Sequence, residues 1–139
     1  MAAFNKFDQF VADVANKVHN LGSDTLKVAL TNTAPVATNT VFADIAEIAA
    51  RNGYAAGGGA ATAITSGQAG GTYILRLGNV AFTAADGAIG PFRYCVLYNA
   101  TPAAGNLIGW YDNGSALTIM AGSTFQVQFD PAAGVLQLA

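Results

Sequence analysis

The sequence contains one histidine, His19, and one cysteine, Cys95, which are the residue types most often used in acid–base and nucleophilic catalysis. No serine lies in a Gly-x-Ser-x-Gly motif, so a catalytic triad would have to be built around His19 alone. His19 lies near the carboxyl end of a predicted N-terminal helix, where the helix dipole favours a cation. Cys95 lies among alternating apolar residues, which predicts a buried strand position. We therefore expect no enzymatic activity.

Aspartates and glycines are the other residues that could bind a ligand. Asp86, Asp112 and Asp130 lie beside or near Gly, Asn or Pro, as is typical of turns. Calcium needs several oxygen ligands from one loop, and each of these turns offers a single carboxylate. The run Gly57-Gly58-Gly59 is not followed by the Lys-Ser or Lys-Thr of a phosphate-binding loop, so it predicts a flexible surface loop. We expect no metal and no cofactor.

The charge content is low for a protein of 139 residues. Charged residues make up 10% of the chain and hydrophobic residues 53%, whereas a typical soluble domain is about 25% charged. The formal net charge is −2 and the basic residues are dispersed, which argues against a nucleic-acid groove. No apolar run approaches the ~20 residues of a membrane span, and the first residues lack the layout of a signal peptide. We expect a protein that is intracellular when made and whose surface is partly covered by neighbouring molecules.

The N-terminal part of the chain predicts two helices around one strand. Apolar residues at three-and-four spacing over the first 21 residues predict an amphipathic helix that ends at Gly22. Alternation from Leu26 to Leu30 predicts a strand, and a second short helix is expected over residues 40–49 after a polar loop. The first helical stripe consists of Phe4, Phe7, Val11, Val14, Val18 and Leu21.

The C-terminal half has a period of two and frequent turn signals. Asn113-Gly114 between two apolar runs predicts a β-hairpin, and residues 61–66 predict a weak strand. Short strands punctuated about every ten residues are typical of a sandwich or barrel. We expect a single mainly β domain over residues 1–139, a jelly-roll-like antiparallel β-sandwich with an N-terminal helix and a second short helix. Its parts are a helix–strand–helix segment (1–53), a Gly-rich loop (54–71) and β-strands (72–139), with strands expected at 73–77, 80–82, 92–98, 107–111, 116–120, 125–129 and 135–138.

Aromatic residues of the predicted strands are best explained as core or cross-strand pairs, although a subunit interface or a sugar-binding face is also consistent with them. These residues are Phe92, Tyr94, Tyr98, Trp110 and Tyr111. Trp110 and Tyr111 are adjacent in a predicted strand and must face opposite ways, so one of them is a candidate for an exposed anchor. The candidate partner-interface residues are Phe4, Phe7, Phe10, Tyr54, Gly57, Gly58, Gly59, Trp110 and Tyr111.

Two stretches of the chain resemble small structural proteins of tailed phages. They are Phe4 to Phe10 continuing through Val18 to Asn32, and Ile89 to Asn99 followed by Leu107 to Tyr111. The chain is similar to capsid cement (decoration) proteins, of the kind found on the shell of a podovirus that infects Bordetella. This resemblance covers nearly the whole chain and carries no catalytic residues.

The resemblance implies a virion protein on the capsid exterior that binds the major capsid protein and stabilises the shell. It implies a jelly-roll-like fold, and we expect a homodimer because two-fold contacts are the commonest symmetric solution. The alternative from another class is a tail-associated structural or receptor/carbohydrate-binding module. A tail-tube or connector subunit is a second structural alternative.

Overall fold

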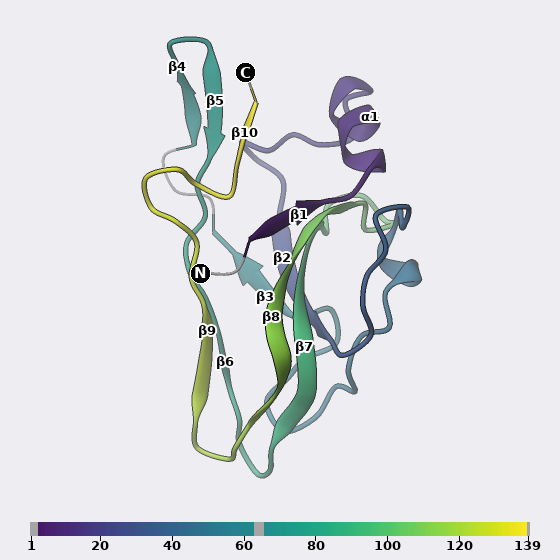
Figure 1. Cartoon of the computed structure of the whole chain (residues 1–139), viewed down its shortest axis with the longest axis vertical. Coiled ribbons are helices and arrows are strands. Elements are labelled where there is room, and N and C mark those ends of the chain that lie inside the picture. The colour runs from purple at the N-terminus through teal and green to yellow at the C-terminus, as the bar shows by residue number, and fades with distance from the viewer. Residues whose placement is uncertain (1–2, 63–65, 139) are drawn as a thin grey trace.

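The structure is a computed structural model that describes residues 3–62 and 66–138. It is mainly β, and its paired strands form three antiparallel sheets (Figure 1). The largest sheet has five strands in the order β1-β8-β7-β2-β3. Its strands are β1 (Phe4–Lys6), β2 (Leu26–Thr31), β3 (Gly59–Ala61), β7 (Ile89–Asn99) and β8 (Leu107–Ile119).

Two smaller sheets complete the fold. A three-stranded sheet has the order β10-β5-β4, and a two-stranded sheet pairs β6 with β9. In Figure 1, β6 and β9 run along one long side of the molecule, beside the β7–β8 hairpin. The bounds are β4 (Gly67–Ala69), β5 (Thr72–Leu75), β6 (Val80–Thr83), β9 (Thr124–Val127) and β10 (Leu136–Leu138).

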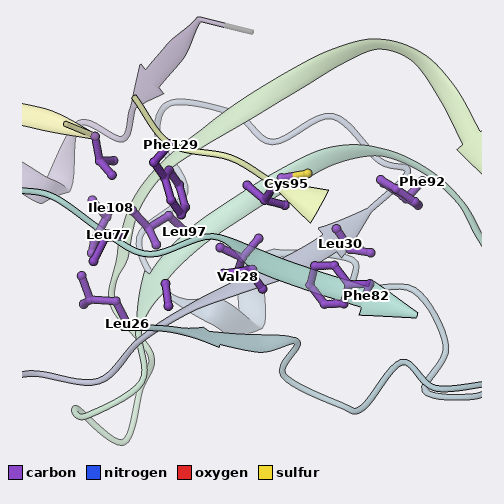
Figure 2. Packing of buried hydrophobic residues seen from close by; sticks show 14 of the residues in the cluster. Leu26, Val28, Leu30, Leu77, Phe82, Phe92, Cys95, Leu97, Ile108 and Phe129 are labelled. Atoms are coloured by element: carbon purple, nitrogen blue, oxygen red, sulfur yellow. The ribbon is translucent and has the colours of Figure 1, made fainter. Parts of the chain in front are cut away.

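The main core lies between the five-stranded sheet and the strands β5, β6 and β9 (Figure 2). Alternate residues of the strands provide the side chains of this core. Leu26, Val28 and Leu30 of β2 point inward, while Ala29 joins a second cluster, the outer cluster, on the outer face of the same sheet. Phe82 of β6, and Phe129 just after β9, contribute from the opposing side. Two apolar layers with antiparallel strands are compatible with a β-sandwich, as the sequence pattern predicts.

The prediction of one helix over the first 21 residues is wrong. The chain instead forms β1, then the seven-residue helix α1 (Gln9–Ala15). Asn16 and Lys17 end α1, because Lys17 adopts a left-handed conformation with φ +66° and the N–H of Val18 bonds to the carbonyl of Asp13. Valine, asparagine and aspartate are weak helix formers, which explains why the pattern yields only two turns.

The second predicted helix is also reduced, to the single 3₁₀ turn Phe42–Asp44. The following residues pair with β2 instead: Glu47 bridges Thr31, and the N–H of Ile48 bonds to the carbonyl of Leu30. Tertiary pairing therefore overrides the helical spacing of Phe42, Ile45 and Ile48.

The predicted hairpin at Asn113-Gly114 is wrong as well. Strand β8 continues through it to Ile119, and the β7 register jumps from Tyr94↔Asp112 to Phe92↔Leu117. Residues 113–116 of β8 lie opposite the single residue Arg93 of β7 and form a bulge in which Gly114 has φ +91°. The Asn113-Gly114 pair thus marks a glycine with a left-handed backbone, as predicted, but this glycine forms a bulge within β8 and does not reverse the chain.

The remaining strand predictions are largely confirmed. Strands β2, β5, β6, β7, β9 and β10 lie within or beside the predicted segments. The weak strand predicted at 61–66 is replaced by β3, which ends at Ala61, and part of that prediction falls on residues 63–65, outside the described residues.

Candidate functional site

The three N-terminal phenylalanines pack against other residues of the same chain. Phe7 is 0% exposed and packs on Trp110 with ring centroids 4.6 Å apart, on the outer face of the five-stranded sheet. Phe10 is buried in the main core, and Phe4 stacks edge-on against Tyr111 at 5.5 Å. The predicted stripe is therefore divided between two clusters and does not form an exposed docking face.

Trp110 and Tyr111 face opposite sides of β8, as predicted. Trp110 joins the outer cluster with Phe7, whereas Tyr111 packs on the main core and lies 6.0 Å from the Phe129 ring. Both side chains are half-buried, so neither is the exposed anchor that the sequence suggested. Among the other predicted aromatics, Phe92 and Tyr98 are buried.

The glycine loop is held by a polar network, so the expectation of a flexible loop is wrong. The carboxylate of Glu47 accepts hydrogen bonds from the hydroxyl of Tyr54 at 2.6 Å and from the N–H of Gly57 at 2.7 Å. The hydroxyl of Tyr98 donates to the carbonyl of Gly57 at 2.6 Å. Gly58 approaches the Val28 backbone, and Gly59 begins β3. Burial, with the Glu47 carboxylate, raises the pKa of Tyr54, which therefore stays a neutral donor.

Replacing Glu47 with alanine should lower the free energy of unfolding by about 1–3 kcal/mol, because it leaves the Tyr54 hydroxyl and the Gly57 N–H without their acceptor. Glu47→Gln keeps an acceptor oxygen and serves as the matched control, with a smaller loss. Urea unfolding of the three proteins measures the difference. Equal stability of Glu47→Ala and the unchanged protein would show that the network does not hold the loop.

His19 lies in a buried polar cluster rather than at an exposed helix end. The side-chain NH₂ of Asn99 donates to His19 Nδ1 at 3.0 Å and to the Asp24 carboxylate at 2.6 Å. The side-chain oxygen of Asn99 accepts from the N–H of Thr101. Because Asn99 is fixed by these partners, His19 Nδ1 must accept, and its proton lies on Nε2, 3.8 Å from the Asp13 carboxylate. Burial lowers the pKa of His19, against the opposing effect of Asp13 and Asp24.

We expect the stability of the fold to decrease as the pH falls below about 6.5, the pKa of an unfolded histidine. The folded state holds His19 neutral with a lowered pKa, so the unfolded state binds more protons in this window. The contribution of neutral His19 to the free energy of unfolding is therefore complete above the pKa of the unfolded histidine. It is lost as the pH falls below that value. Urea midpoints between about pH 7 and pH 5 measure the effect, and His19→Gln should flatten the profile. A profile unchanged by His19→Gln would show that another group causes it.

Two of the three aspartates expected in turns, Asp112 and Asp130, have structural partners. Asp112 lies in β8 rather than in a hairpin turn, and forms a two-bond ion pair with Arg93. This guanidinium lowers the pKa of the exposed Asp112 carboxyl. Asp130 accepts the N–H groups of residues 132 and 133, and Asp86 has φ +65°. Within residues 3–62 and 66–138, no group of three or more His, Cys, Asp or Glu side chains could hold a metal ion.

Cys95 is buried in β7, as predicted. Desolvation raises the pKa of its thiol to about 12, so the thiol stays protonated. Cys95 lines a crevice of about 310 Å³ between β8 and β9, which we call the amide crevice. Its other lining residues are Tyr111, Asn113, Phe125, Gln126, Val127 and Gln128.

A second hollow, which we call the apolar groove, lies at the other end of the β7–β8 hairpin. It has a volume of about 490 Å³ and is lined by residues 41–43, 98, 100 and 102–105, none of which is charged. Phe42 and Tyr98 stack along it with ring centroids 4.6 Å apart. In the sequence, Thr101-Pro102 predicts only a turn. The signal that could have indicated the groove is the absence of charge from residues 98–107, which contain three alanines and a proline.

Comparison with known proteins does not identify the chain. Among the described residues, no helix is long and apolar enough to cross a membrane. Family models, curated proteins and solved structures give no match to this sequence or fold.

Proposed function

We propose that this chain is a virion structural protein, a capsid cement or decoration protein that binds the outer surface of a phage head. The observation that carries the proposal is the apolar groove on an antiparallel β scaffold, since apolar grooves without charge are typical of protein contact surfaces. The resemblance of residues 4–10, 18–32, 89–99 and 107–111 to phage cement proteins supports the same function. Its partners are the major capsid protein and a second copy of itself in a homodimer.

The two-layer core and antiparallel pairing support a jelly-roll-like sandwich for this role. A cement protein spans joints between shell subunits and strengthens them through several weak contacts, each raising the effective concentration of the next. Low charge suits such contacts, because an unpaired charge buried at an interface costs several kcal/mol by rough estimate.

Particles that lack the protein test the proposal. Heads assembled without it should release their DNA at a lower temperature than complete particles, and adding the purified protein should restore the release temperature. The control is an unrelated acidic protein of similar size. Heads of unchanged stability, with no uptake of the added protein, would contradict the cement function.

The amide crevice supports the alternative, a receptor- or carbohydrate-binding module on a tail. Aromatic walls from Tyr111 and Phe125 beside the amides of Asn113, Gln126 and Gln128 are a combination suited to neutral sugars. A glycan array with the isolated protein tests this alternative. Specific binding that Gln126→Ala abolishes would favour the tail function, and no binding would remove its main support.

A further inference from the structure

Three segments far apart in the sequence lie side by side at the end of the molecule that carries the apolar groove. The N–H of Asp8, just before α1, bonds to the carbonyl of Ala37. The N–H of Phe42 bonds to the carbonyl of Gly105, and the Asn106 amide donates to Asp13 of α1 at 3.1 Å. In Figure 1, α1 and the segment leading to the 3₁₀ turn lie on the same side of the five-stranded sheet. We call the surface formed by residues 8–15, 35–44 and 100–106 the groove face.

The groove face exposes more apolar surface than the groove alone. Val11 on α1 is 54% exposed and Val36 is 57% exposed, two of the three large hydrophobic residues that the described chain leaves most open to solvent. Ala43, Ala103 and Ala104 are also exposed along the groove. The hydrogen bonds that join the segments make this a preformed surface rather than a set of loose loops.

The charge on the groove face has one sign. Its charged residues are Asp8, Asp13 and Asp44, and its three segments contain no lysine or arginine. Asp13 is buried and bonded to Asn106, while Asp8 and Asp44 are exposed. The backbone N–H groups of Thr40 and Val41 donate to the Asp44 carboxylate and lower its pKa, so Asp44 is ionised at neutral pH.

We propose that the groove face is the surface that meets the shell, and that it receives an apolar side chain of the partner bordered by lysine or arginine. The groove supplies an uncharged hollow for the apolar side chain, and Asp44, which follows the groove residue Ala43, supplies a negative charge next to it. Asp8 adds a second exposed negative charge elsewhere on the groove face. This proposal rests on the proposed cement function for the identity of the partner, the major capsid protein. It goes beyond that function by naming the contact surface and the chemistry of its partner.

Two substitutions of opposite charge at one exposed position test the proposal. Ala104→Arg and Ala104→Glu add side chains of similar reach at the groove. The matched control is Ala116→Arg, on the exposed bulge of β8 at the opposite end of the β7–β8 hairpin. Binding of each purified protein to shells that lack it is measured by co-sedimentation, and circular dichroism and urea midpoints verify that each variant is folded.

Ala104→Arg should weaken binding by ~10-fold or more, because it places a cation against the basic border of the partner. Ala104→Glu should weaken binding by no more than about threefold, and Ala116→Arg should leave it unchanged. Normal binding by all variants would overturn the groove face while the cement function stands. Equal loss for Ala104→Arg and Ala104→Glu would overturn the basic border. Failure of the unchanged protein to bind shells would overturn the cement function and, with it, this contact.

Discussion

Replacing Phe7 with alanine is expected to lower the free energy of unfolding by about 3–5 kcal/mol. The Phe7 ring is fully buried between the N-terminal segment and Trp110, on the outer face of the five-stranded sheet. Its loss leaves a cavity in the outer cluster, whose other members include Val96, Leu107 and Trp110. Urea unfolding followed by the fluorescence of Trp110, the only tryptophan in the chain, measures both the stability and the local environment.

Val11→Ala is the control for Phe7→Ala, because Val11 lies on the same N-terminal segment and is exposed. It should change stability by no more than about 0.5 kcal/mol. A loss below about 1 kcal/mol for Phe7→Ala would contradict the packing described for this segment, and would revive Phe7 as an exposed contact residue.

Gly58→Ala is expected to destabilise the fold by about 2–5 kcal/mol. Gly58 has φ +84°, and a Cβ atom at this position would collide with the carbonyl oxygen of Val28. The substitution therefore adds both a strained left-handed backbone and a collision with strand β2, which cannot move without disturbing its pairing with β7. Thermal and urea unfolding measure the change.

Gly70→Ala separates these two causes. Gly70 also has a positive φ, +58°, but a methyl group added there would have no neighbouring atom within 4 Å. It should therefore show only the backbone penalty of about 1–2 kcal/mol. Equal losses at Gly58 and Gly70 would show that the glycine loop can move away from β2, and that the network around Glu47 does not fix it.

The strands were predictable because their alternation is regular. In β2, and in β7 from Cys95 to Tyr98, the apolar residues face the main core and the outer cluster alternately, so the period of two reports the fold directly there. The structure of the first 21 residues was not predictable from local spacing, because Phe4, Phe7 and Phe10 fit a helical stripe but pack against different partners. Two of those partners, Tyr111 and Trp110, lie about a hundred residues away, and local spacing carries no information about them.

The candidate site was predictable only in part. Low charge indicated a covered surface, and the structure places an uncharged groove at one end of the fold. The residues chosen from their type, such as Phe10 and Tyr54, are buried because aromatic side chains are used first in the chain's own core. Ala103 and Ala104 have no distinctive chemistry, so only their position beside Phe42 and Tyr98 indicates a contact surface.

The copy number of the protein in purified virions tests the central claim most directly. Quantitative mass spectrometry would compare its amount with that of the major capsid protein in the same particles. A cement protein that covers the shell predicts hundreds of copies in a simple ratio to the shell subunit. A handful of copies per particle would contradict this function and would place the protein at the tail or at a single vertex.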